Sequence, residues 1–217
     1  MTGTRPKNLA IYGGSFDPFH NGHLKTALTV QKEFNFEEII FLPCKFPVLK
    51  KDAQASVEQR ISMLKLGLIR YPKFSVDLRE INRESPSYMV ETLKSYRKDF
   101  GVRIPVTLIL GMDAFKQLPK WYQWQEILQL CNLLVLHRPH ISSEVTEEPL
   151  KTVLKNHKTM NKHDFLKSTC GKIYCFDAGH YDISSTWLRK QIKEGKDIGP
   201  YLPTPVFSYI QEYKLYR

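Results

Sequence analysis

The chain has 217 residues, of which 42% are hydrophobic and 12% aromatic, enough for the core of one domain. No run of about 18 apolar residues is present, and the first residues lack the apolar stretch of a secretory signal, so we expect a cytoplasmic protein with no membrane partner. Four cysteines without a C-x-x-C pair exclude the disulfide-rich class, and the formal net charge of +10 leaves polyanionic partners open.

Short apolar runs alternate with stretches of helical periodicity along the whole chain. The runs predict strands at 9–12, 39–42, 74–77, 106–110, 133–136 and 173–176. The periodic stretches predict helices at 24–34, 57–69, 88–100, 121–130, 184–194 and 204–212. This alternation is typical of an α/β fold with a doubly wound parallel sheet. We expect one domain over 1–217, with 183–217 as its small C-terminal helical part.

Local signals refine some of these boundaries. Ser56 and Gln59 form the pattern of a capping box, and Thr204 followed by Pro205 suggests an N-cap for the last helix. The polar stretch 140–149 is expected to be a surface loop. Residues 158–168 are expected to be mobile, with Phe165 and Leu166 as local anchors.

The first functional motif is Gly13-Gly14-Ser15-Phe16-Asp17-Pro18-Phe19-His20-Asn21-Gly22-His23-Leu24, between the first strand and the first helix. Its glycines allow close approach of a ligand, and free N–H groups at a helix start favour an anion. His20 and His23 are three residues apart, so both imidazoles can donate hydrogen bonds to one phosphate. We therefore expect a phosphate to bind at Gly13, Gly14, His20 and His23.

The same motif permits other interpretations. Two histidines at this spacing could be half of a metal site, but no neighbouring Cys or third His completes a usual ligand set, so we expect no protein-held metal. The dinucleotide pattern G-x-G-x-x-G and the Walker A pattern are both absent from this stretch. A phosphate site without either pattern is the preferred hypothesis.

A second motif follows the last predicted strand: Ile183-Ser184-Ser185-Thr186-Trp187-Leu188-Arg189. Ser184 is a suitable N-cap, which places Ser185 in the first helical turn with Arg189 one turn later on the same face. Hydroxyl, N–H and guanidinium groups together suit phosphate oxygens. An ordinary capped helix with an exposed Arg is the plainer alternative for this segment taken alone.

A third group of residues suits the rest of a substrate. Gly111 closes a predicted strand, and the carboxylate of Asp113 could accept hydrogen bonds from sugar hydroxyls. Trp121 offers a flat face for an aromatic base, whereas we expect Trp124 to pack in the core.

These segments carry a family resemblance. The first motif resembles the signature of the nucleotidyltransferase superfamily related to class I tRNA synthetases, and its longer form F-D-P-x-H-x-G-H-L is similar to that of the bacterial nicotinate-nucleotide adenylyltransferases. I-S-S-T-x-x-R resembles their C-terminal ATP-phosphate motif, and G-M-D-x-F-x-x-L-P-x-W-Y resembles their acceptor segment. P-S-Y-M-V-E-T-L and H-R-P at 137–139 resemble further family segments, so similarity spans about residues 8–217.

The resemblance implies a Rossmann-like fold and transfer of AMP from ATP to nicotinate mononucleotide, giving deamido-NAD and pyrophosphate in NAD biosynthesis. It implies His20, His23 and Arg189 as catalytic residues, with Mg²⁺ held mainly by ATP phosphates. The implied ATP-binding residues are Gly13, Gly14, Ser15, Phe16, His20, His23, Gly111, Asp113, Ile183, Ser184, Ser185 and Arg189. The implied acceptor-binding residues are Lys50, Tyr88, Met89, Asp113, Trp121, Tyr122 and Arg138.

The sequence departs from the family at four of the matched positions. Met89 stands where the family usually has Thr, and a thioether cannot donate the hydrogen bond that a hydroxyl would. His137 replaces the first Arg of R-R-P, and Val48 and Leu49 replace Pro and His before Lys50. These changes concern the acceptor pocket rather than the reaction class.

Two rival functions remain open. The nearest is another transferase of the superfamily that uses nicotinamide mononucleotide, pantetheine phosphate or a cytidylyl donor. The other is a non-catalytic nucleic-acid-binding protein, motivated by the charge of +10. Because the basic residues are scattered, with the densest stretch at 151–172, we expect a solvated basic face and no nucleic-acid partner. A monomer and a homo-oligomer both remain compatible with the sequence.

Overall fold

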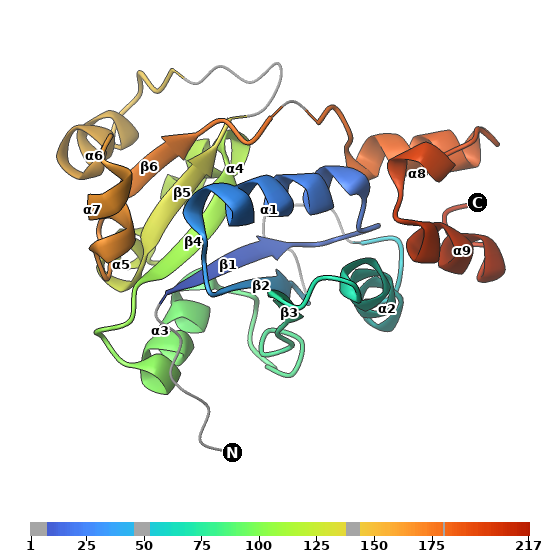
Figure 1. The fold of residues 1–217 in the computed structure, drawn as a ribbon, viewed down its shortest axis with the longest axis horizontal. Helices are drawn as coiled ribbons and strands as arrows, with labels where there is room; N and C mark the ends of the chain where they lie inside the picture. The colour runs from blue at the N-terminus through green and yellow to red at the C-terminus, as the bar shows by residue number, and fades with distance from the viewer. Residues whose placement is uncertain (1–7, 46–52, 138–143, 180) are drawn as a thin grey trace.

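A parallel β-sheet organises the protein in the computed structural model, which describes residues 8–45, 53–137, 144–179 and 181–217 (Figure 1). The described strands are β1 (Leu9–Gly14), β2 (Glu38–Pro43), β3 (Phe74–Val76), β4 (Val106–Gly111), β5 (Asn132–Leu136) and β6 (Ile173–Phe176). They form one six-stranded sheet in the order β3-β2-β1-β4-β5-β6.

The strand order reverses between β1 and β4. The chain moves outward from β1 through β2 to β3, then crosses back so that β4 pairs with the other edge of β1, with Leu9 opposite Val106 and Tyr12 opposite Ile109. All pairings are parallel, as the sequence predicted. In such doubly wound sheets the crevice beyond the strand ends at this reversal is the usual ligand site.

Helices connect the strands and cover both faces of the sheet (Figure 1). Those before β5 are α1 (Asn21–Phe34), α2 (Val57–Leu68), α3 (Met89–Phe100), α4 (Met112–Lys116), the 3₁₀ turn η1 (Leu118–Lys120) and α5 (Trp124–Leu130). Those after it are α6 (Leu150–His157), α7 (Lys162–Lys167), α8 (Ser185–Lys193), the 3₁₀ turn η2 (Gly199–Tyr201) and α9 (Thr204–Glu212).

Alternate side chains of each strand enter two separate cores, because successive residues of a strand point to opposite faces. On one face Ala10 and Tyr12 of β1 pack with apolar residues of α1, α2, α8 and α9. On the other face Leu9 and Ile11 pack with residues of α3, α4 and α5. The central strands are thus buried on both sides, which explains their nearly continuous apolar sequence.

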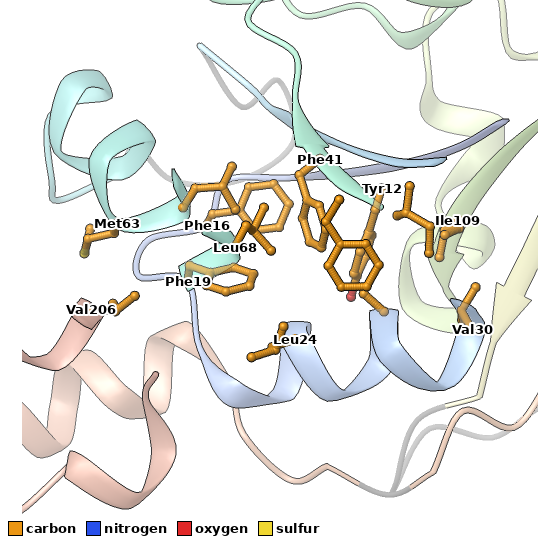
Figure 2. Packing of buried hydrophobic residues seen from close by; sticks show 14 of the residues in the cluster. Tyr12, Phe16, Phe19, Leu24, Val30, Phe41, Met63, Leu68, Ile109 and Val206 are labelled. Carbon is orange, nitrogen blue, oxygen red and sulfur yellow. The ribbon is translucent and has the colours of Figure 1, made fainter. Parts of the chain in front are cut away.

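The C-terminal helices α8 and α9 share the first of these cores. Figure 2 shows Val206 of α9 facing Met63 of α2 and Phe19 of the first motif. Gly67 of α2 allows this close packing, since a β-carbon there would overlap the ring of Phe19. The end of the chain therefore packs beside the loop that precedes α1.

Several local predictions need correction. The helix predicted at 121–130 begins only at Trp124, because the 3₁₀ turn η1 precedes it and Gln123 adopts a left-handed conformation with φ of 48°. Thr204 is the first residue of α9 rather than its N-cap, which is Pro203. The capping box of Ser56 and Gln59 is confirmed.

Segments expected to be irregular also contain helices. Residues 158–168, predicted to be mobile, instead include α7, whose start is capped by the Asn161 side chain and whose Phe165 is fully buried. In 140–149 the described residues 144–149 form no helix or strand, and α6 follows at once. Across the described ranges, no helix combines the length and apolar character needed to cross a lipid bilayer.

Candidate functional site

The two histidines of the first motif form the start of α1. His20 is the N-cap residue, and its Nδ1 accepts a hydrogen bond from the backbone N–H of His23 at 3.3 Å. In return the backbone N–H of His20 donates to Nδ1 of His23 at 3.4 Å. The rings stack with centroids 3.7 Å apart and planes 25° apart. This reciprocal cap has the geometry of a capping box built from two imidazoles.

The cap also determines which nitrogen of each ring can donate. An Nδ1 atom that accepts a backbone N–H bond carries no proton, so in the neutral ring the proton is on Nε2. Both His20 and His23 therefore present an Nε2–H donor at the N-terminus of α1, where the helix dipole is positive. Two N–H donors on one helix end suit an anionic oxygen.

Gly22 is required by the same geometry. A β-carbon at this position would lie 2.9 Å from Nδ1 of His20 and 3.4 Å from Cβ of Ile183. The first distance is too short for any side chain, so only glycine lets the imidazole of His20 cap the helix. The second distance shows that the two motifs, far apart in the sequence, touch at this point.

Hydrogen bonds join the second motif to the first. The Ser185 hydroxyl donates to the carbonyl oxygen of Pro18 at 3.0 Å, and Nη1 of Arg189 donates to that of Asp17 at 2.6 Å. The Ser184 hydroxyl caps α8 by accepting from the backbone N–H of Trp187 at 3.1 Å. The two motifs, each expected from the sequence to bind phosphate, therefore lie side by side, and polar side chains of the second motif make the junction.

One cavity lies where the motifs meet, and we call it the histidine cavity. Its walls come from β1, α1, the end of β4, the end of β5 and the segment before α8. It is lined by Tyr12, His20, Gly22, His23, Thr26, Gly111, Leu136, His137, Ala178, Gly179, Tyr181 and Ile183. Of the predicted ATP-binding residues, it contains His20, His23, Gly111 and Ile183.

A larger cavity adjoins it, and we call it the tryptophan cavity. Its volume is about 250 Å³, against about 60 Å³ for the histidine cavity. It is lined by Tyr12, Gly13, Gly14, Ser15, Leu42, Cys44, Glu80, Ser87, Tyr88, Met89, Leu108, Ile109, Leu110, Gly111, Asp113, Ala114, Gln117, Lys120, Trp121 and Tyr122. Tyr12 and Gly111, at the ends of β1 and β4, line both cavities. The two cavities therefore meet at the reversal of strand order.

Aromatic side chains and a methionine shape the tryptophan cavity. The rings of Tyr88 and Tyr122 pack at a tilt of 32° with centroids 4.6 Å apart, although half of Tyr122 is exposed. Met89 is the first residue of α3, and its Cε would lie 3.4 Å from a β-carbon at Gly13. The thioether thus covers the glycine end of β1. Trp124 packs against the second core, as expected.

Glu80 is a cavity residue that the sequence did not point to. Its side chain is only 2% exposed and accepts a hydrogen bond from the Thr92 hydroxyl at 2.7 Å. Burial raises its pKa above the usual value, although hydrogen bonds from Thr92 and Ser87 and the charge of Arg83 oppose the shift. The only sequence signal for Glu80 was its position three residues before Arg83. That spacing does not indicate a ligand cavity.

Other predicted residues lie outside the two cavities as the described residues outline them. Phe16 is 1% exposed and packs against Phe19 and Phe41, so its ring belongs to the core and is not available to ATP. Ser184, Ser185 and Arg189 lie at the junction of the motifs instead. Lys50 and Arg138 fall outside the described residues.

Titratable metal ligands are dispersed rather than clustered. Within 8–45, 53–137, 144–179 and 181–217, no three side chains of His, Cys, Asp or Glu are grouped so that they could hold one ion. A divalent cation at this site would therefore take most of its ligands from a bound substrate. Phosphate oxygens are suitable ligands, because Mg²⁺ commonly keeps few protein ligands beside a nucleotide.

Comparisons with known proteins agree with this geometry. The sequence profile described as cytidylyltransferase-like matches residues 11–191. A protein of Legionella pneumophila (strain Paris) named "Probable nicotinate-nucleotide adenylyltransferase" is 45% identical over 210 residues, 97% of this chain and 99% of that protein. One of the same name from Yersinia pestis (strain Pestoides F) is 38% identical, with coverage of 96% and 94%.

Among solved structures, the nicotinic acid mononucleotide adenylyltransferase of Plasmodium falciparum, complexed with NaAD, has the same fold. The TM-score is 0.71 with 97% of each chain covered, at 22% sequence identity. The fold agrees with the sequence relationship, which rests on the much closer bacterial relatives. The chain therefore belongs to the nicotinate-nucleotide adenylyltransferases of the cytidylyltransferase-like nucleotidyltransferase family.

Proposed function

We propose that this enzyme transfers AMP from ATP to nicotinate mononucleotide, giving deamido-NAD and pyrophosphate. The observation that carries the proposal is the junction of two unlike cavities at Tyr12 and Gly111. One cavity presents imidazole donors and the other presents aromatic side chains. An adenylyl group and a pyridine nucleotide placed in them would meet at the strand reversal, where the bond between them must form.

The histidine cavity is the proposed site of the adenylyl group. The Nε2–H groups of His20 and His23 would donate to oxygens of the ATP α-phosphate, whose negative charge increases in the transition state. The reciprocal cap holds both rings before substrate arrives, so little reorganisation accompanies the reaction. Preorganised donors of this kind are among the largest contributions to catalysis.

The start of α8 is the proposed site of the β- and γ-phosphates. Backbone N–H groups in the first turn of this nine-residue helix, together with the Arg189 guanidinium, make a positive region beside the first motif. Ser185 is bonded to Pro18 and so holds the helix start against the motif. We propose that pyrophosphate leaves from this side.

The tryptophan cavity is the proposed acceptor site. Trp121 would stack on the pyridine ring, and Asp113 would accept hydrogen bonds from ribose hydroxyls. Tyr88 and Tyr122 would close the outer side. Gly13, Gly14 and Ser15, which the resemblance implies as ATP-binding residues, line this cavity and would lie where the phosphates of the two substrates meet. Lys50 and Arg138, outside the described residues, remain proposed contacts for the acceptor.

The start of α3 supports nicotinate rather than nicotinamide as the base. Met89 begins this helix on the cavity wall, and its N-cap residue Tyr88 makes no side-chain capping bond within the described structure. First-turn N–H groups and the positive helix end favour a carboxylate over a neutral amide. Burial raises the pKa of Glu80 on the same wall, which makes the carboxyl harder to ionise there than in water.

The chemistry needs no protein nucleophile. A phosphate oxygen of the mononucleotide attacks the α-phosphorus of ATP in line, and the bond to the pyrophosphate oxygen breaks. The attacking oxygen is already anionic, so positioning and charge stabilisation supply the catalysis. We propose Mg²⁺ as the cation that accompanies ATP, where it would neutralise phosphate charge. We also propose that the enzyme is cytoplasmic and has no nucleic-acid partner. The proposal is compatible with a monomer or a homo-oligomer.

An acceptor and donor panel tests this function. Pyrophosphate release is measured with ATP or CTP against nicotinate mononucleotide, nicotinamide mononucleotide and pantetheine phosphate. The proposal requires ATP with nicotinate mononucleotide to give the highest kcat/KM, and deamido-NAD to be the product by mass spectrometry. A higher kcat/KM with another pair would assign the enzyme to a different transferase. Release of no pyrophosphate, with tight salt-dependent RNA binding, would favour the nucleic-acid rival.

A further inference from the structure

The penultimate residue of the chain reaches the first motif. The Tyr216 hydroxyl donates to Oδ1 of Asp17 at 2.7 Å, across 199 positions of sequence. Tyr216 is 8% exposed and Asp17 is 2% exposed, so the bond is buried. It lies outside both cavities as the described residues outline them, and the proposed reaction does not use it.

Asp17 is the centre of a buried polar network. Besides the Tyr216 hydroxyl, its carboxylate accepts the backbone N–H groups of Gln54 at 2.8 Å and Ala55 at 3.1 Å. Its Oδ2 also lies 3.4 Å from Nη1 of Arg189, which donates to the Asp17 carbonyl oxygen. One residue thus binds Arg189 through both its backbone and its side chain, three positions before the imidazole pair.

The backbone of the tail indicates that this contact is specific. Lys214 and Tyr216 adopt left-handed conformations, with φ of 49° and 65°, which residues with a β-carbon rarely adopt. Such conformations persist where surrounding contacts hold them. Leu215 is buried beside Tyr216, whereas the terminal Arg217 is exposed. Burial and the neighbouring Asp17 raise the pKa of the Tyr216 hydroxyl, which keeps it protonated as a donor.

We propose that Tyr216 is a positioning residue for the donor side of the site: by fixing the Asp17 carboxylate, its hydroxyl orients Arg189 toward the ATP phosphates. The inference rests on the proposed function, because it assigns Arg189 to ATP. The Arg189 guanidinium is the only group in this hydrogen-bond network that has a proposed substrate contact. The tail therefore acts on catalysis through Asp17 and Arg189 and not through the tryptophan cavity.

A double-mutant cycle tests the proposal. Tyr216→Phe keeps the ring and removes the hydroxyl, and we expect kcat/KM for ATP to fall roughly tenfold, the scale of one hydrogen bond to a charged group. The KM for the acceptor should change less than about twofold, because the tail does not reach that cavity. In an Arg189→Ala background the same substitution should have almost no further effect, since its target is gone.

Controls separate positioning from folding. Tyr213→Phe removes a hydroxyl from a 54% exposed tyrosine of the same tail and should leave both KM values unchanged. Replacing Tyr216 with 4-aminophenylalanine retains a donor and should restore much of the lost kcat/KM. If Tyr216→Phe does not fold, Asp17→Asn replaces it in the cycle, because an amide keeps an acceptor for Tyr216 but removes the charge facing Arg189.

The outcomes are distinct from those of the functional proposal. A wild-type enzyme that makes no deamido-NAD removes the proposed function itself. An active wild type in which Tyr216→Phe keeps its full kcat/KM for ATP overturns the positioning role. The role is also overturned if the substitution costs the same factor with and without Arg189, or if it raises the KM for the acceptor as much as that for ATP.

Discussion

The two cavities are built in different ways. The histidine cavity is held by hydrogen bonds that involve the backbone: His20 and His23 cap α1, and Ser185 and Arg189 donate to carbonyl oxygens of the first motif. The tryptophan cavity is lined by the glycines of β1 and β4 and by many side chains, including a tilted tyrosine pair and the thioether of Met89. Main-chain bonds thus hold the groups of the proposed chemical step, while replaceable side chains surround the proposed acceptor.

This difference suggests a division of labour within the site. Groups fixed by backbone bonds can serve any nucleotidyl transfer, since an α-phosphate is common to all such donors. Walls made of side chains can be altered without moving the strand ends at Tyr12 and Gly111. Substitutions on the two sides should therefore differ in kind, with kcat affected on one side and the KM or choice of acceptor on the other.

Removing one imidazole should give the largest effect. We expect His23→Ala to lower kcat by about 10²–10³, because one preorganised donor to the transition state is lost. Initial rates of pyrophosphate release at saturating substrates measure this directly. His163→Ala, on an imidazole that is 70% exposed, is the matched control and should match the wild type. A kcat within a few-fold of the wild type would remove His23 from the mechanism.

Removing the aromatic platform should affect the other side. Trp121→Ala is expected to raise the KM for nicotinate mononucleotide roughly tenfold, through lost stacking and apolar contact. The KM for ATP should stay within about twofold. Trp124→Phe, on a partly buried tryptophan that packs against the same core and begins α5, controls for general damage to this segment. Equal increases in both KM values would mean that the cavities do not separate the two substrates.

Met89 offers a smaller and more selective test. We expect Met89→Thr to increase the preference for nicotinate over nicotinamide mononucleotide by about five- to tenfold, because a hydroxyl donates more strongly to a carboxylate than to a neutral amide. The ratio of the two kcat/KM values measures the effect. An unchanged ratio would place the carboxylate away from the start of α3.

The smallest effect concerns stability and pH. Because the pKa of Glu80 is raised in the folded protein, its ionisation opposes folding as pH rises above about 4.5, the ordinary value. Glu80→Gln should therefore melt at the same temperature as the wild type near that pH and at a higher temperature at neutral pH, and thermal melts at the two pH values measure the difference.

Glu84→Gln, which changes an exposed acid of the same loop, is the control for Glu80. A Glu80→Gln variant that melts below the wild type at neutral pH would show that the carboxylate is stabilised when ionised. Thr92 and Arg83 would then outweigh burial in setting the charge of this wall.

Much of the fold could be predicted because its signals are local. Strand β6 has the predicted bounds, and the other strands differ by only one or two residues at an end, since buried parallel strands are continuous apolar runs. The short helix α4 follows β4 without a gap and was missed. Helices α6 and α7 were missed because they lie in a polar stretch where tertiary contacts such as burial of Phe165 decide the structure.

The same rule applies to the site: residues in short sequence motifs could be predicted, and residues placed by tertiary contacts could not. The histidine pair and the second motif could be found because each is a short run with a recognisable spacing. Burial of the Phe16 ring was not foreseen because the sequence of a loop does not reveal which of its side chains turns into the core. Glu80 and the bond from Tyr216 to Asp17 were not foreseen because they depend on segments that meet only in the folded chain.

The most direct test is a crystal structure of the enzyme with deamido-NAD bound, since that product occupies both proposed subsites at once. The adenylyl phosphate should lie within hydrogen-bonding distance of Nε2 of His20 and His23. The pyridine ring should stack on Trp121, and the bridging phosphates should pass Tyr12 and Gly111. A product whose pyridine ring lies against the histidines, or which binds away from the β1–β4 reversal, would contradict the account.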